Sequence, residues 1–169
     1  MATTLIAQTV YFVDASLPDL TTLLAGLPAN AEVHQIDPAT DGVALMASTL
    51  AGRSGIGAVH LLTHGAAGQV QLGNVSLTQA NLSSYTTEWA TIKGALNADA
   101  DLLIYGCDVA ANDAGKALIS QLADATGADV AASTDLTGAS ALGGNWALEA
   151  ATGAIEAAGI TAFNFDGTL

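Results

Sequence analysis

Short apolar segments alternate with helix-like segments along this chain, and this alternation constrains the fold more than any other feature. Strands are expected at QTVYFVD (8–14), AEVHQID (31–37), GAVHLLTH (57–64), ADLLIYGC (100–107) and ADVAAS (128–133). Helices are expected between them, at 17–27, 41–52, 78–97 and 112–127. Strands separated by helices pair in parallel. The sequence therefore predicts an α/β fold, a three-layer α/β/α sandwich around a mostly parallel sheet of about five or six strands.

The remaining segments are expected to form smaller elements of the same domain. The glycine-spaced stretch 65–77 predicts a small hairpin or extended loop, and NWALEAATGAIEA (145–157) predicts a closing hairpin. A chain of 169 residues is of single-domain size. We therefore expect one α/β domain over 1–160, followed at 161–169 by a C-terminal tail or the start of a linker to further modules.

The charge balance limits the classes of partner. Sixteen acidic residues stand against three basic ones, which gives a net charge of −13. So few cations cannot neutralise a phosphate backbone, and nucleic-acid binding is excluded. No apolar run has the length of a bilayer span, so no membrane insertion is expected. The N-terminal segment has no basic residue before its apolar stretch, so no signal peptide is expected there.

The chemistry-bearing residues of interest lie at the carboxyl ends of two expected strands. His64 ends the third strand and Cys107, the only cysteine of the chain, ends the fourth. Functional groups gather at this edge of parallel sheets, and neighbouring strands lie about 5 Å apart. If the two strands are neighbours, the imidazole can accept the thiol proton. Each residue also adjoins a glycine, so the N–H groups of Gly65 and Cys107 are candidates for an oxyanion hole.

Cys107 and several other residues also have a purely structural interpretation. A lone cysteine on an apolar strand is most often an inert core residue, and only its pairing with His64 favours a site. His60 and His34 are interpreted as satisfied core histidines, and Trp89 and Trp146 as core anchors.

No metal site and no cofactor are predicted. Five acidic residues in expected loops supply carboxylates, but none has the ligand spacing of a calcium loop: Asp37, Asp41, Asp99, Asp101 and Asp135.

The two strand ends resemble a known group of peptidases. HLLTHG and LLIYGC are similar to the His-Gly and Gly-Cys strand ends of the caspase, gingipain and separase superfamily. HLLTHG is also similar to the His-Gly segment of the bacterial CHAT proteases in that superfamily. The cysteine follows the histidine by 43 residues, against about 50 in caspases. The resemblance implies a caspase-hemoglobinase-like fold, with His64 as base, Cys107 as nucleophile and Gly65 with Cys107 as oxyanion donors. The caspase pentapeptide is absent, and Asp108 opposes thiolate formation.

A second resemblance covers nearly the whole chain. Segments such as VDASLPDLTTLLAGL, TGADVAASTDLTG and GGNWALEAATGAIE are similar to an uncharacterised bacterial domain found near the amino end of giant repeat-containing surface or secreted proteins. This resemblance implies a module of an exported protein, secreted or at the bacterial cell surface.

Two functions of different class remain open. The first is a cysteine endopeptidase with a His64–Cys107 dyad that cleaves a polypeptide, with a flexible segment of its own parent protein as the expected substrate. The second is a non-catalytic module of a giant adhesin or secreted repeat protein. For the first, Tyr105 is expected to line the substrate pocket by resemblance, with Asp108 and Asp135 nearby. A small apolar or basic residue before the cut is then expected.

Overall fold

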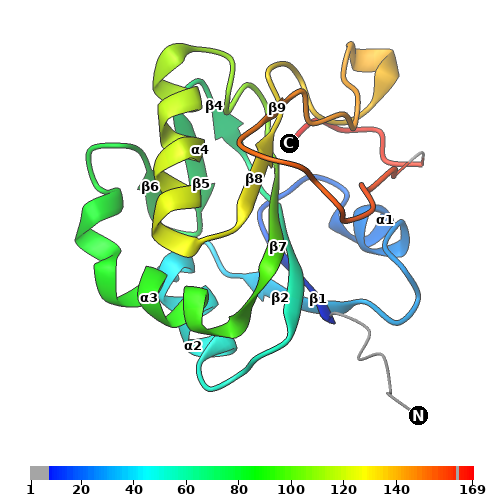
Figure 1. The fold of residues 1–169 in the computed structure, drawn as a ribbon. Helices are drawn as coiled ribbons and strands as arrows, with labels where there is room; N and C mark the ends of the chain where they lie inside the picture. The colour runs from blue at the N-terminus through cyan, green and yellow to red at the C-terminus, as the bar shows by residue number, and fades with distance from the viewer. Residues whose placement is uncertain (1–7, 163) are drawn as a thin grey trace.

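The computed structural model describes residues 8–162 and 164–169 and shows an α/β fold around a six-stranded sheet (Figure 1). Side by side, its strands are β2 (Glu32–Ile36), β1 (Gln8–Asp14), β3 (Ile56–Leu62), β7 (Leu96–Tyr105), β8 (Asp129–Ala132) and β9 (Ala150–Ala151). All neighbouring pairs from β2 to β8 are parallel, and β9 is antiparallel to β8. The mostly parallel sheet predicted from the alternating segments is confirmed.

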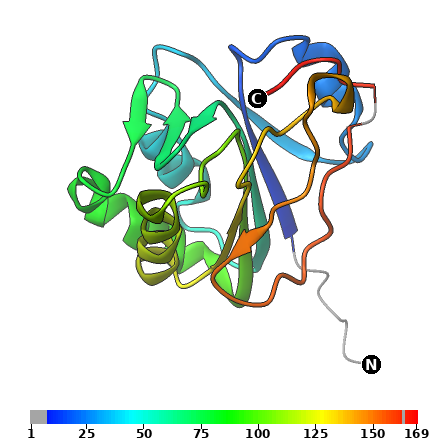
Figure 2. The same ribbon diagram turned by 90° about the horizontal axis from the view of Figure 1, so that it is seen from above.

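The two faces of the sheet are covered unequally. One face carries α2 (Gly42–Leu50), α3 (Thr86–Ala95) and α4 (Asp113–Thr126). The other carries the short helix α1 (Leu20–Ala25) and the chain after β9, which runs along this face without regular structure (Figure 2). The three expected layers are therefore present, but the third consists largely of irregular chain. Two 3₁₀ turns, η1 (Leu82–Tyr85) and η2 (Ser140–Leu142), complete the described elements.

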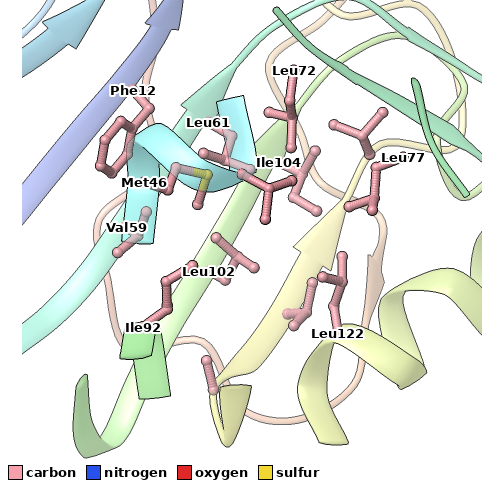
Figure 3. Close-up of a cluster of buried hydrophobic side chains, with 14 of the residues drawn as sticks. Phe12, Met46, Val59, Leu61, Leu72, Leu77, Ile92, Leu102, Ile104 and Leu122 are labelled. Carbon is pink, nitrogen blue, oxygen red and sulfur yellow. The ribbon is translucent and has the colours of Figure 1, made fainter. Parts of the chain in front are cut away.

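The larger core lies between the sheet and α2, α3 and α4 (Figure 3). Side chains alternate between the two faces of a strand, so every second residue of each strand points into this core. Thus Val59 and Leu61 of β3 and Leu102 and Ile104 of β7 all point to the helices, where Leu122 of α4 meets them. Trp89 is buried in the same core and its indole N–H donates to Leu82 O at 3.0 Å, as expected for a core anchor.

The second core contains a stack of aromatic rings. His60 lies between Tyr11 and Tyr105, with ring centroids 4.6 Å and 6.0 Å away. His60 is buried as predicted, but its Nδ1 has no hydrogen-bond partner among the described residues, so the interpretation as a satisfied histidine is wrong. His34, unlike His60, is not a core residue. It lies on β2 at the sheet edge, partly exposed, with Nε2 2.8 Å from Glu32 Oε1. Trp146 is half-buried and packs against this second core.

A small antiparallel sheet connects β3 to the following helices. It comprises β4 (Gly65–Ala66), β5 (Gln69–Leu72) and β6 (Val75–Leu77), in that order. This confirms the expected extended structure at 65–77. The turn between β5 and β6 depends on Gly73, whose φ of +62° favours glycine and whose missing Cβ leaves room for Thr40 O.

Two expected elements differ from the structure. The helix expected at 78–97 is confined to α3, because Leu96 already pairs with Ile56 in the sheet. The closing hairpin at 145–157 is wrong, because β9 pairs with β8 and Asn145 forms an isolated bridge with Thr137. The segment after Gly159 is packed, with four buried side chains at Ile160, Ala162, Phe165 and Leu169.

Two further expectations concern the chain ends and the membrane. The N-terminal segment examined for a signal peptide includes residues 1–7, which lie outside the described part of the chain. Within residues 8–162 and 164–169, no helix combines the length and the apolar character needed to cross a bilayer.

Candidate functional site

The ends of β3 and β7 bring the two candidate residues to the same edge of the sheet. The strands are parallel neighbours, with Leu62 paired to Tyr105, and the Thr63 N–H extends the ladder by donating to Tyr105 O at 3.0 Å. His64 and Cys107 each follow one or two residues later. The condition for the candidate pair, that the two strands are neighbours, is therefore met.

The small sheet holds the backbone of His64 in place. The buried hydroxyl of Thr63 donates to Gln71 O, and the Gln71 N–H donates to His64 O at 2.9 Å. These bonds attach the end of β3 to β5, so the backbone cannot rotate freely at His64. The imidazole itself is partly exposed and, within the described residues, forms no hydrogen bond. It is therefore a ring on a fixed backbone, with both nitrogens available to other groups.

Cys107 is largely covered. Only 6% of the residue is exposed, and its Sγ accepts a hydrogen bond from the Thr137 N–H at 3.4 Å and lies 3.8 Å from Thr137 O. Thr137 is anchored in turn, because its carbonyl accepts from the Leu169 N–H at 3.0 Å. The thiol thus faces the chain that follows β8, and a reagent reaches it only when that chain moves.

Two glycines allow the loops after β3 and β7 to touch. A Cβ at Gly65 would lie 2.7 Å from Cys107 O and 2.6 Å from a Val109 methyl group. A Cβ at Gly106 would lie 3.0 Å from Thr63 O. The two distances at Gly65 are too short for a side chain, so this approach requires glycine there, and the 3.0 Å distance favours glycine at Gly106.

The small sheet does not use the N–H groups of the two candidate oxyanion donors, Gly65 and Cys107. Because the Gln71 N–H bonds His64 O, the next pair, Gly65 with Val70, is a non-hydrogen-bonded pair. The Gly65 N–H therefore points away from β5. Among the described residues, no acceptor takes the N–H of Cys107. Backbone donors without partners beside a nucleophile are the components of an oxyanion hole.

The three expected pocket residues occupy different environments. Tyr105 is fully buried, its hydroxyl accepts from the Ile160 N–H at 2.8 Å, and burial raises its pKa to about 12. Its side chain reaches a substrate only if the C-terminal segment is displaced. Asp108 has a left-handed backbone (φ +59°), and its N–H donates to Asp135 O at 2.8 Å. The Asp135 carboxylate is held by the Asn145 amide at 3.0 Å.

Sequence reasoning missed Thr137 and the hollow next to it. The hollow has a volume of about 510 Å³ and an apolar lining that includes Gly138, Ala139, Trp146, Ala162 and Phe165. It begins one residue after the thiol's hydrogen-bond partner. These residues come from irregular segments without periodicity, so the available sequence signal is the aromatic pair Trp146 and Phe165, of which Trp146 is interpreted above as a core anchor.

Comparison with known protein families matches residues 10–166 to the Domain of unknown function (DUF4347). Comparisons with curated proteins and with solved structures gave no match. The matched range begins within β1 and ends within the packed C-terminal segment, so it covers most of both cores and the candidate site. The chain therefore belongs to the DUF4347 family.

Proposed function

We propose that this domain is a cysteine endopeptidase with Cys107 as nucleophile and His64 as general base. His64 takes the thiol proton while sulfur attacks the scissile carbonyl, and the N–H groups of Gly65 and Cys107 stabilise the oxyanion. The C–N bond then breaks, the leaving amine takes the proton from the imidazolium, and a thioester remains on Cys107. Water activated by His64 hydrolyses the thioester and restores the thiol.

The observation that carries the proposal is the pairing of β3 with β7, which places His64 and Cys107 at neighbouring carboxyl ends of a parallel sheet. The Cys107 N–H, which has no acceptor among the described residues, adds support as a candidate oxyanion donor. The resemblance of HLLTHG and LLIYGC to the caspase, gingipain and CHAT group supplies the reaction class.

The contact between the Cys107 thiol and Thr137 limits when cleavage can occur. Peptide cleavage requires the chain around Thr137 to leave Cys107, so the structure corresponds to a closed form under this proposal. The same hydrogen bonds favour the second candidate function, a non-catalytic surface module in which Cys107 has a structural role. The two functions make opposite predictions for cleavage.

The surroundings of the site support an apolar residue before the cut. The apolar hollow beside Thr137 has room for a side chain, and the carboxylates of Asp108 and Asp135 disfavour an acidic one. We propose a flexible segment of the parent polypeptide as substrate, because tethering gives a high effective concentration. The resemblance to modules of giant exported proteins supports a location outside the cell.

Cleavage of a longer native polypeptide and of a peptide library tests the proposal. The wild type is expected to cut, whereas Cys107→Ala and His64→Ala are expected to lose cleavage while their free energies of unfolding change by less than about 2 kcal/mol. His34→Ala, a histidine change at the far edge of the sheet, is the control and should keep full activity. Cleavage that survives either site substitution contradicts the dyad, and no cleavage of any substrate favours the non-catalytic module.

A further inference from the structure

Three carboxylates converge on the second face of the sheet, away from the His64–Cys107 edge. Asp101 of β7 pairs in register with Asp129 of β8, and Glu156 from the chain after β9 joins them. One oxygen of each carboxylate lies within 4.8 Å of those of the other two. Like charges directly opposite each other on neighbouring strands are destabilising. Six residues separate Asp101 from Cys107, about 20 Å along an extended chain, so this cluster is a separate location.

Asp101 has an oxygen without a partner. The residue is only 1% exposed, and its Oδ2 accepts from the backbone N–H groups of Glu156 and Ala157 at 2.9 and 2.7 Å. Its Oδ1 is buried and has no donor among the described residues. A buried carboxylate oxygen left in this state costs free energy unless a further ligand is bound.

The hollow beside this cluster contains a second unpartnered atom. Asp101 and Glu156 line a hollow of about 580 Å³ together with His60, whose buried Nδ1 also lacks a partner. No basic side chain in the described part of the chain forms an ion pair with the three carboxylates. The hollow is therefore acidic, and two of its lining residues, Asp101 and His60, have buried polar atoms without hydrogen-bond partners among the described residues.

We propose that Asp101, Asp129 and Glu156 bind a divalent cation, and that the cation is Ca²⁺. Calcium takes oxygen ligands at about 2.3–2.6 Å, so ligand atoms on opposite sides of it are about 4.6–5.2 Å apart. The three carboxylate oxygens lie within 4.8 Å of one another, which the calcium sphere accommodates. One carboxylate from each of three separate segments, with room for water, suits the flexible, high coordination number of Ca²⁺ better than the strict octahedron of Mg²⁺. Asp129 and Glu156 are accessible, so water completes the shell.

The backbone around the cluster is shaped to admit these carboxylates. A Cβ at Gly153 would lie within 2.0 Å of Asp129 Oδ1, so glycine leaves the space that the carboxylate occupies. The bound cation links β7 and β8 to the chain after β9. Calcium thereby fixes the start of the irregular segment that covers the second core.

Thermal unfolding with and without calcium tests the proposal. We expect the midpoint of chelator-treated wild type to rise by roughly 5–10 °C in 10 mM CaCl₂, relative to NaCl of equal ionic strength, if the dissociation constant is about 10⁻⁴ M. Calorimetric titration with CaCl₂ should give one site. Asp129→Asn and Glu156→Gln, both at accessible positions that leave the fold intact, should each lose most of the rise.

Asp99→Asn is the matched control. Asp99 lines the same hollow and is exposed, but it is not one of the three converging residues, so this change removes an equal charge without removing a ligand. It should keep the calcium response. An absent response in wild type, or an equal loss in Asp99→Asn and Asp129→Asn, overturns the proposal.

Discussion

Gly115→Ala is expected to destabilise the domain by about 3 kcal/mol or more, a fall in midpoint of roughly 6–12 °C. Gly115 is buried in the first turn of α4, where a Cβ would lie 1.9 Å from Val109 O and 2.8 Å from Ala110 Cα. Both are backbone atoms of the loop that follows Cys107, so the clash cannot be relieved by a rotamer change. The helix must shift away from this loop. Urea or thermal unfolding measures the loss.

Gly94→Ala provides the matched comparison. Gly94 is also inside a helix, α3, but a Cβ there meets nothing within 4 Å. Alanine has the higher helix propensity, so this change should stabilise the protein by about 0.5–1 kcal/mol. Equal effects of the two substitutions would contradict the close approach of α4 to the Cys107 loop.

Acid is expected to destabilise the protein through His60. Burial lowers the pKa of His60 from its usual 6.5 to about 4, so the unfolded chain takes up this proton at a higher pH than the folded one. The stabilisation is complete above about pH 6.5 and is lost as pH falls toward 4. Between pH 7 and pH 5 the expected loss is about 2 kcal/mol.

His60→Phe tests this origin of the pH dependence. Phenylalanine keeps a ring between Tyr11 and Tyr105 and removes both the titrating group and the unpartnered Nδ1. The free energy of unfolding should then change far less between pH 7 and pH 5. His34→Gln, a change at a partly exposed histidine that leaves the His60 stack in place, serves as control and should retain a steeper slope than His60→Phe. The same slope in His60→Phe would show that another group is responsible.

Local patterns were sufficient for the central sheet. The strand expected at 8–14 coincides with β1, and β3 and β7 are neighbours, the arrangement on which the His64–Cys107 pairing depends. Asn112 caps α4 by accepting from the Gly115 N–H, and Gly127 ends it with a left-handed backbone, as their residue types predict.

The errors lie where distant contacts determine the conformation. The chain at 145–157 does not form a hairpin, because Asp101 takes the backbone N–H groups of Glu156 and Ala157 from across the sheet. A hydrogen bond between residues so far apart in the chain leaves no periodic pattern in the sequence. The cover on Cys107 has the same origin, since Thr137 comes from an irregular segment held by Leu169. The converging carboxylates were likewise hidden, because Asp101, Asp129 and Glu156 meet only through sheet pairing.

The reactivity of the single thiol tests the central claim, that His64 activates Cys107. Because Cys107 is the only cysteine, the uptake of iodoacetamide reports on this site alone. The chain around Thr137 slows alkylation equally in wild type and variants. The ratio of the alkylation rates of wild type and His64→Ala therefore measures the effect of the imidazole. At pH 7 we expect His64→Ala to react at least about tenfold more slowly than wild type, while His34→Ala matches wild type. Equal rates in wild type and His64→Ala would contradict the dyad.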